Sequence, residues 1–205
     1  MAWALMFAVA RRVVEGDGFV RAGNWKGWAP LQYLGLDISG STLGLVGLGR
    51  IGRAMFQRAK GFDMKVLYWN RTRMGADEER ELGVEYVELE ELLAQSDFVS
   101  LHVALTEGTK HLIDERRLGQ MKSTAYLINT ARGPVVDEKA LVRALQANTI
   151  AGAGLDVFEN EPQIEPELFE LDNAVLAPHL GSATIATRSK MGELAVENCL
   201  AGCTG

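Results

Sequence analysis

Short apolar runs of strand length alternate with helical patterns over most of this chain, and that alternation limits the folds open to it. The runs lie at 43–47, 65–69, 98–103, 125–129, 151–157 and 174–177, with a shorter one at 84–87. Helical patterns lie between them at 51–60, 89–95, 115–121 and 137–146, and a last one follows at 185–200. Most runs lack the polar alternation of a half-exposed strand, so we expect strands that are buried on both faces.

Strands that alternate with helices predict a doubly wound parallel sheet of the α/β class. Parallel neighbours need a crossover connection, which is usually a helix. Strands that are apolar on both faces need helices on both sides of the sheet. The length of 205 residues suits one compact domain.

The first forty residues follow a different pattern. Residues 2–15 are rich in helix formers, and a Gly-Asp-Gly segment at 16–18 follows them, so we predict one mostly buried helix there. The next stretch, to about Ser41, holds Trp25, Trp28 and several glycines and predicts a structured loop.

The charge balance excludes several classes of partner. With 21 basic and 27 acidic residues, the formal net charge is -6. The chain therefore lacks the positive field that holds nucleic acid or an anionic membrane surface, and we expect neither as a partner.

The cysteines and the apolar N-terminus indicate a soluble, cytoplasmic protein. The 2 cysteines, Cys199 and Cys203, cannot form a disulfide framework or complete a four-ligand metal site, so no metal is predicted. The apolar run at 2–10 is followed, not preceded, by arginines, which is unlike a signal peptide. It is also shorter than the roughly 20 residues that span a bilayer.

A glycine motif follows the first predicted strand and opens a predicted helix. Residues 47–52 read Gly-Leu-Gly-Arg-Ile-Gly, which is a G-x-G-x-x-G pattern. Gly47 would allow the tight turn, Gly49 would let a pyrophosphate approach the backbone, and Gly52 would let the helix pack close to the strand. The free N–H groups at the helix start would then bind the phosphates. The motif predicts a dinucleotide site.

The residues after the second strand bear on which dinucleotide is preferred. NAD-binding domains place an acidic residue here, on the ribose 2′-hydroxyl. This chain has Asn70, Arg71, Thr72 and Arg73 instead. Charge-assisted hydrogen bonds to a 2′-phosphate are each worth about 1.5–3 kcal/mol, so we predict that NADP(H) is preferred and that NAD(H) is also possible. The alternative is a solvated loop that merely lacks the acidic residue.

Three later segments each place an ionisable residue just after an apolar strand, where open α/β sheets bind ligands. They supply Arg132, Glu161 and His179. A guanidinium can bind the carboxylate or carbonyl oxygen of a 2-keto acid through its rigid fork. An imidazole can give a proton to that oxygen around neutral pH, and a carboxylate that contacts the imidazole favours its protonated form.

Each of these residues also has a simpler explanation. His179 could be an ordinary loop residue after a proline, and Arg132 could be a charge at a helix start. Glu161 lies in an acidic stretch with Glu159 and Glu165 that could be merely solvated.

Taken together, the motifs resemble those of the D-isomer-specific 2-hydroxyacid dehydrogenases, and within them the glyoxylate/hydroxypyruvate reductases. The resemblance is carried by GLGRIG at 47–52, SLHVALT at 100–106, NTARG at 129–133, GLDVFENEP at 154–162 and PHLGSAT at 178–184. It covers nearly the whole chain.

The resemblance implies roles for particular residues. It implies Arg132, Glu161 and His179 as the catalytic set, with His179 as the acid/base and Glu161 as its partner. It also implies that Asp156 holds the nicotinamide carboxamide. The predicted cofactor-binding residues are Gly47, Gly49, Arg50, Ile51, Gly52, Asn70, Arg71, Thr72, Arg73, Val103, Thr109, Thr130, Ala131, Asp156 and Gly181.

The resemblance also implies an organisation for the chain. Residues 1–205 are predicted as a single Rossmann-type dinucleotide-binding domain, with an interdomain helix and dimerisation loop at 1–40, a core at 41–184 and a truncated C-terminal helix at 185–205. Similar members are homodimers that pair through the first helix and the loop after it, which would place Trp25 and Trp28 in the interface. Alternatively, these tryptophans cap the core of their own chain.

Two functions remain open at this stage. The first is NAD(P)H-dependent reduction of a small 2-keto acid such as glyoxylate or hydroxypyruvate. Family members have a second, smaller domain that completes the substrate pocket, and we expect the chain to lack it and to have an incomplete substrate site. The second is a non-catalytic NAD(P)-binding sensor or interaction module related to the same family. A complete acid/base pair favours the first.

Overall fold

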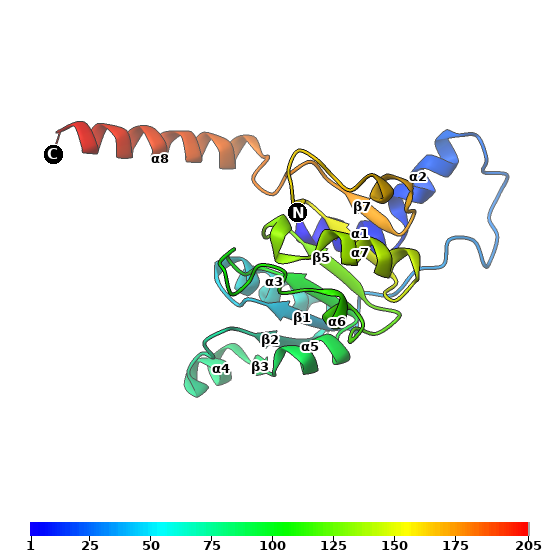
Figure 1. Cartoon of the computed structure of the whole chain (residues 1–205), viewed down its shortest axis with the longest axis horizontal. Coiled ribbons are helices and arrows are strands. Elements are labelled where there is room, and N and C mark those ends of the chain that lie inside the picture. Colours follow the sequence, from blue (N-terminus) through cyan, green and yellow to red (C-terminus); the bar gives the residue numbers. More distant parts are fainter. Residues whose placement is uncertain (205) are drawn as a thin grey trace.

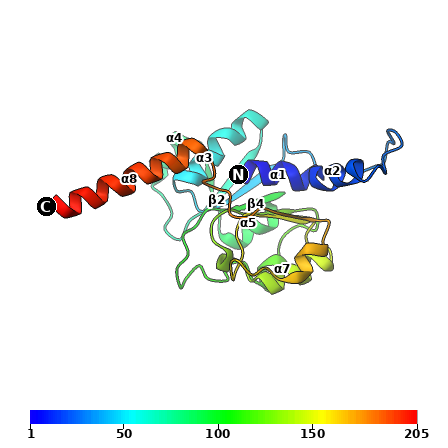
Figure 2. The same cartoon turned by 90° about the horizontal axis from the view of Figure 1, so that it is seen from above.

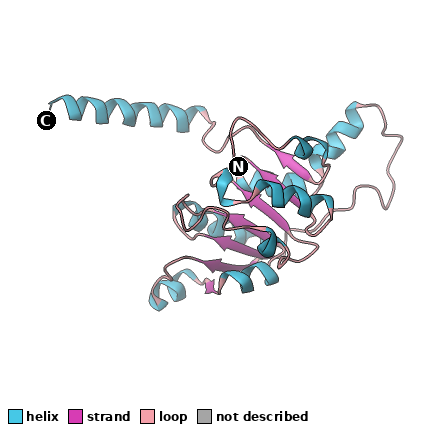
Figure 3. Cartoon of the chain, viewed as in Figure 1, coloured by secondary structure: helices cyan, strands magenta, loops and turns pink. Residues whose placement is uncertain are grey.

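The strands form one seven-stranded parallel sheet within residues 1–204, the part of the chain that this computed structural model describes. Their order is β3-β2-β1-β4-β5-β6-β7 (Figures 1 and 3). The chain runs from β1 outward to β3, returns to the other side of β1, and then runs outward from β4 to β7. The sheet is therefore doubly wound, and the predicted fold class is confirmed.

The strands agree with the predicted runs to within one or two residues at each end. They are β1 (Thr42–Val46), β2 (Lys65–Trp69), β3 (Glu85–Tyr86), β4 (Phe98–Leu101), β5 (Tyr126–Asn129), β6 (Gly152–Leu155) and β7 (Ala174–Leu176). Several end earlier than predicted, because residues such as Gly47 and Val103 leave the ladder and form loops. These loops build the candidate site.

Helices connect the strands. They are α1 (Ala2–Ala10), α2 (Val13–Arg21), α3 (Arg50–Ala59), α4 (Ala76–Leu82), α5 (Leu89–Gln95), α6 (Glu115–Leu118), α7 (Glu138–Gln146) and α8 (Ile185–Thr204), with short 3₁₀ helices at Lys60–Phe62, Gly133–Val135 and Pro166–Glu170. Helix α4 was not predicted, because its sequence ADEEREL is mostly charged and shows no apolar period.

Helices lie on both sides of the sheet, as Figure 2 shows from above, and an apolar layer packs between the sheet and the helices on each side. On one face, α1 and α3 bury residues such as Met6 and Phe56 against the sheet. On the other face, α5, α6 and α7 bury residues such as Leu92, Leu118 and Leu141. The expectation of helices on both sides is met.

The predicted single helix at 2–15 is wrong. Helix α1 ends at Ala10, Arg12 takes a left-handed conformation with φ 52°, and α2 then begins at Val13. Arg12 donates two hydrogen bonds to Glu15 in the first turn of the new helix, at 2.7 and 2.8 Å. The glycines at 16 and 18 lie inside α2 and do not end it, since glycine weakens a helix by only about 1 kcal/mol.

Helix α2 and the loop after it project from the body, as does α8 (Figure 1). The side chains of Trp25 and Trp28 are 56% and 84% exposed, so they do not cap the core of their own chain. Gly205, the last residue of the predicted domain, lies outside the described residues. Among residues 1–204, no helix has both the length and the apolar character that crossing a bilayer requires.

The strand register aligns the loops that carry the motifs. Across the sheet, Trp69, Val46, Leu101, Asn129, Leu155 and Leu176 pair in one row. The residues that follow this row include Asn70, Gly47, His102, Thr130 and Asp156. Residues far apart in the sequence are thereby brought to one edge, which is the edge that binds ligands in open α/β sheets.

Candidate active site

The glycine motif forms a tight turn at the point where the strand order reverses. Gly47 has φ 101°, and a Cβ atom there would lie 2.8 Å from the carbonyl carbon of His102. A Cβ atom on Gly52 would lie 2.2 Å from the carbonyl oxygen of Gly47, so α3 packs directly on the turn. At Gly49 a Cβ atom would meet nothing within 4 Å. The backbone at Gly49 is therefore open to a ligand, as predicted from the motif.

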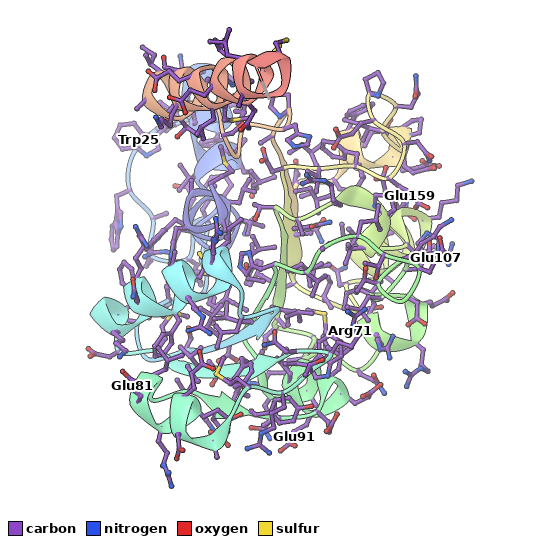
Figure 4. All side chains as sticks on the ribbon, turned by 90° about the vertical axis from the view of Figure 1, so that its left-hand side faces the viewer. Trp25, Arg71, Glu81, Glu91, Glu107 and Glu159 are labelled. Carbon is purple, nitrogen blue, oxygen red and sulfur yellow. The ribbon has the colours of Figure 1, made fainter. Side chains whose placement is uncertain are left out.

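The polar residues after β2 fall into two groups. The Oδ1 atom of Asn70 accepts a hydrogen bond of 2.7 Å from the backbone N–H of Leu48, so Asn70 braces the glycine turn. Arg71 and Asn70 line a cleft of about 200 Å³ together with Gly47 and Gly49. In Figure 4, which faces the carboxyl ends of the strands, Arg71 lies near the middle of this edge.

Arg73 has a carboxylate partner instead of facing this cleft. Its Nε and Nη2 atoms donate to the two carboxylate oxygens of Glu79 at 2.8 and 2.7 Å, and its guanidinium lies over the ring of Tyr86. Glu79 also accepts a hydrogen bond from the buried hydroxyl of Tyr68. The hydrogen bonds from Arg73 and Tyr68 lower the pKa of Glu79 to about 2. Sequence reasoning did not single out Glu79, because one Glu in a charged helix carries no signal.

His102 is the residue of this region that sequence reasoning left without a role. It lies in the SLHVALT motif, beside the glycine turn, and lines the same cleft as Arg71. Its Nε2 atom lies 2.9 Å from the Oγ atom of Ser100. Burial lowers the pKa of His102 to about 4, so the imidazole is neutral at pH 7.

The loop at 103–109 forms the outer wall of this cleft. Val103 lines the cleft directly. The buried hydroxyl of Thr109 donates to the carbonyl oxygen of Ala104 at 2.7 Å and accepts from the N–H of Thr106 at 2.8 Å. Thr109 therefore fixes the shape of the loop, and it also lines the cleft, so its predicted role in binding cofactor stays a prediction.

A larger cleft of about 640 Å³ gathers the residues from the other motifs. It is lined by Thr130, Arg132, Asp156, His179 and Gly181 among others. Ile51 lines both this cleft and a neighbouring one of about 460 Å³, where Val103 and Ala131 also lie. Most of the predicted residues thus meet at one edge of the sheet. Arg50 and Thr72 are exposed and line neither of these clefts.

His179 and Glu161 are in contact. The Nδ1 atom of His179 lies 2.9 Å from Oε2 of Glu161, and the other carboxylate oxygen accepts a hydrogen bond of 3.1 Å from the N–H of Phe158. Partial burial raises the pKa of Glu161, but the hydrogen bonds from His179 and Phe158 and the charge of Arg132 outweigh it and hold that pKa below its usual range. The carboxylate therefore stays ionised at neutral pH. It contacts the Nδ1 atom of His179 and not the Nε2 atom.

The backbone at His179 is unusual. The residue has φ 54°, in the left-handed region that non-glycine residues seldom adopt. The N–H of the next residue, Leu180, donates to Oδ1 of Asp156 at 2.6 Å. Asp156 is 1% exposed, so it anchors the turn that carries His179.

Arg132 lies on the loop after β5. Its Nη1 atom donates to the carbonyl oxygen of Ala131 at 2.6 Å, and the side chain lines both larger clefts. The larger cleft therefore brings the guanidinium of Arg132 together with the imidazole of His179, which in turn contacts the carboxylate of Glu161. This set can bind an anionic substrate and move a proton.

The residues present fit a dinucleotide and give no support to a metal. The open backbone at Gly49 and the start of α3, which no side chain caps within residues 1–204, can receive phosphates. The described residues contain no group of three or more His, Cys, Asp or Glu side chains that could hold a metal ion.

Comparison with known proteins adds a family match over most of the chain. Residues 3–181 match the model described as "D-isomer specific 2-hydroxyacid dehydrogenase, NAD binding domain". A glyoxylate reductase from Thermococcus litoralis is 56% identical over 209 residues. That alignment covers 100% of this chain and 63% of the relative.

Solved structures of related proteins are similar to this chain over nearly its whole length. A glyoxylate reductase from Paecilomyes thermophila is 43% identical with a TM-score of 0.89, over 99% of this chain and 60% of that one. An NADPH-dependent glyoxylate/hydroxypyruvate reductase from Sinorhizobium meliloti, solved with NADP and malonate, is 38% identical with a TM-score of 0.90, over 99% of this chain and 62% of that one. The chain thus spans about three fifths of the length of these proteins.

Proposed function

Because this chain belongs to the D-isomer-specific 2-hydroxyacid dehydrogenases, through their NAD-binding domain, we propose that it takes part in reducing a small 2-keto acid to the D-2-hydroxy acid. The observation that carries the proposal is the contact of 2.9 Å between Glu161 and His179, which lines the same cleft as Arg132. A module that only binds the cofactor would have no need of such a pair.

His179 acts as the acid in this proposal. Glu161 occupies its Nδ1 atom, so the imidazole presents Nε2 to the substrate. The side chain is 48% exposed, which leaves it accessible from the cleft. In the proposed reaction Nε2 of His179 gives its proton to the carbonyl oxygen of the keto acid, while Glu161 holds the ring through Nδ1.

Arg132 binds and orients the substrate. A guanidinium offers two parallel N–H donors to a carboxylate and stays charged at every relevant pH. Arg132 follows β5 and lines the same cleft as His179, which suits a substrate whose carboxylate and carbonyl groups are adjacent. The same charge adds to the hydrogen bonds that lower the pKa of Glu161.

The proposed cofactor is a nicotinamide dinucleotide. The glycine turn and the start of α3 would hold its pyrophosphate, Asn70 and Arg71 would face its adenosine ribose, and Val103, Thr130, Ala131 and Asp156 would line the nicotinamide side. When bound in its reduced form, this group supplies the hydride.

We further propose that NADP(H) is preferred and that glyoxylate or hydroxypyruvate is the substrate. Arg71 lines the cleft where NAD-binding domains carry an acidic residue. The relatives named glyoxylate reductase, and the one solved with NADP, support both assignments. We also propose the division at residues 40/41 and 184/185 and a homodimer formed through residues 1–40.

Oxidation of NADPH by the 205-residue chain, with hydroxypyruvate or glyoxylate, tests the activity. Because the substrate site is expected to be incomplete, turnover should be low, and it should fall at least a hundredfold further in His179→Ala and in Glu161→Gln. Glu167→Gln, an exposed carboxylate in the same acidic stretch, should stay within twofold of the unchanged chain. Circular dichroism checks that each variant is folded. Binding of NADPH by a folded chain that gives no turnover would reject catalysis by this chain alone, and would mean either a reductase fragment with an incomplete substrate site or a binding module.

A further inference from the structure

The loop that carries Glu161 connects β6 to the 3₁₀ helix at Pro166–Glu170 and has little regular structure. Glu161 must nevertheless stay within hydrogen-bond distance of His179 for the pair to work. A side chain on an irregular loop is held only as well as its backbone is held. The contacts that fix this backbone are therefore relevant to the reaction.

Backbone N–H groups on both sides of Glu161 donate to the same buried carboxylate, that of Glu138. The N–H of Glu159 donates to Oε2 of Glu138 at 2.7 Å, and the N–H of Glu165 donates to Oε1 of Glu138 at 2.9 Å. These donors stand two residues before and four residues after Glu161. Glu138 is 6% exposed, although its residue type is seldom buried unless it is paired. Bonds from N–H groups to an ionised carboxylate are about twice as strong as neutral ones.

The side chain of Glu159 in turn contacts residues of two neighbouring segments. The Oε2 atom of Glu159 accepts a hydrogen bond of 3.2 Å from the backbone N–H of Glu138. Its Oε1 atom lies 2.6 Å from Nε2 of His111, which follows the loop at 103–109. Figure 4 shows Glu159 on the side of the molecule where these loops meet. Glu159 thus ties the loop to two neighbouring segments.

Glu138 lies at the start of a helix that packs in the core. It is the first residue of α7, whose residues Leu141 and Leu145 are each 1% exposed and lie in the core. Asp137 caps the same helix by accepting a hydrogen bond of 2.9 Å from the N–H of Ala140. The carboxylate of Glu138 therefore connects a core helix to both ends of the loop.

We propose that Glu138 is a positioning residue that holds Glu161 against His179 by fixing residues 159 and 165. This inference rests on the proposed function, because it takes the Glu161–His179 pair as the acid/base pair. Glu138 makes no contact with that pair and acts only through the backbone of the loop. Neither the proposed cofactor site nor the proposed substrate site explains why the carboxylate of Glu138 is buried.

The test compares Glu138→Ala and Glu138→Gln with the unchanged chain. We expect Glu138→Ala to speed hydrogen exchange of the amides in 158–165 at least tenfold, to shift the side-chain NMR signals of His179, and to lower kcat at least tenfold. The KM for NADPH should stay within twofold, because the glycine turn is untouched. Glu138→Gln keeps one acceptor oxygen, so its effects should be intermediate, and it remains informative if the alanine variant fails to fold.

Val142→Ala, which removes buried volume from the same helix, is the matched control. It should lower the thermal midpoint but leave kcat and exchange in 158–165 within twofold. The proposal is overturned if the Glu138 variants keep normal exchange and His179 signals, or if Val142→Ala loses as much kcat as they do. If Glu161→Gln is as active as the unchanged chain, the proposed function fails. The exchange rates and the His179 signals decide separately whether Glu138 holds the loop, and they do so even if the unchanged chain gives no turnover.

Discussion

Gly133 lies so close to the carbonyl group of Phe158 that a Cβ atom on the glycine would be 1.8 Å from the carbonyl oxygen. Gly133 follows Arg132, and Phe158 donates its N–H to Glu161. This one contact therefore joins the loop that carries the guanidinium to the loop that carries the carboxylate. A side chain at 133 would force the two loops apart.

Replacing Gly133 by alanine should consequently separate Arg132 from the Glu161–His179 pair. The added methyl would meet backbone atoms, which cannot move as a flexible side chain does, and overpacking of this kind costs about 1–3 kcal/mol or more. We expect kcat for hydroxypyruvate to fall at least tenfold, with a lower thermal midpoint. Steady-state kinetics and a thermal melt measure the two effects.

Gly61→Ala is the control for this variant, since a Cβ atom at Gly61 would meet nothing within 4 Å. It should leave both kcat and the thermal midpoint nearly unchanged. A Gly133→Ala enzyme with normal kcat would mean that the loops tolerate separation, and the close approach would then have no role in the reaction.

The two arginines after β2 should contribute unequally to NADPH binding. Arg71 lines the cleft beside the glycine turn, whereas Arg73 donates two hydrogen bonds to Glu79. We expect Arg71→Ala to weaken NADPH binding at least tenfold and NADH binding less than threefold, because each charge-assisted bond to the 2′-phosphate is worth about 1.5–3 kcal/mol. Arg73→Ala should change the ratio of the NADPH and NADH dissociation constants less than Arg71→Ala does. Fluorescence titration with both cofactors gives the dissociation constants.

Arg80→Ala, an exposed arginine on α4, serves as the control and should leave both dissociation constants unchanged. Equal losses of NADPH and NADH binding in Arg71→Ala would remove the assignment of the 2′-phosphate to this residue.

The fold and most of the candidate site could be predicted because their signals are local in sequence. The apolar runs indicated the strands, and residues just after a strand reach the binding edge in any parallel sheet, so Arg132 and His179 could be placed in advance. The split between α1 and α2 was missed, because it depends on the left-handed backbone conformation of one residue, Arg12. Arginine has no special preference for that conformation.

Contacts between distant residues could not be predicted in the same way. Glu79 and Glu138 carried no signal in the sequence, but they bind Arg73 and the loop at 159–165. The pairing of a carboxylate with a particular N–H or guanidinium depends on tertiary structure, which a single sequence does not reveal. The assignment of Arg73 to the cofactor relied on sequence position alone, and its bond to Glu79 became visible only in the fold.

Buried His102 should make the chain less stable in mild acid. Its pKa is about 4 in the folded chain because of burial, against an ordinary value of 6.5. The unfolded chain therefore binds a proton below pH 6.5 that the folded chain does not, so stability is complete above pH 6.5 and is lost as the pH falls toward 4. Each pKa unit corresponds to about 1.4 kcal/mol, which gives a loss of a few kcal/mol.

Urea denaturation at intervals from pH 7.5 to pH 4 measures this loss in the unchanged chain and in His102→Gln. The variant should lose less stability over that range, even if it is less stable at pH 7.5. His111→Gln, which replaces a histidine that is more exposed, is the comparison. Parallel curves for the unchanged chain and His102→Gln would show that His102 does not cause the acid sensitivity.

The loop after α2 should form an interface between two copies of the chain. Its Trp28 and Leu31 side chains are 84% and 80% exposed, and α2 buries none of its residues. Exposed apolar residues gathered on one segment are characteristic of interaction surfaces. We therefore expect a dimer at micromolar concentration in sedimentation velocity, and we expect Trp25→Ala/Trp28→Ala to raise the dissociation constant at least tenfold.

Phe169→Ala removes an aromatic side chain that is 65% exposed but lies outside this loop, and it should leave the dimer unchanged. NADPH binding should also survive in the double tryptophan variant, because the glycine turn and Arg71 lie at the carboxyl ends of the strands, away from the loop. A chain that sediments as a monomer at micromolar concentration would contradict the interface. A dimer that persists in the double variant would place the interface on another surface, and the exposed tryptophans would then need a different partner.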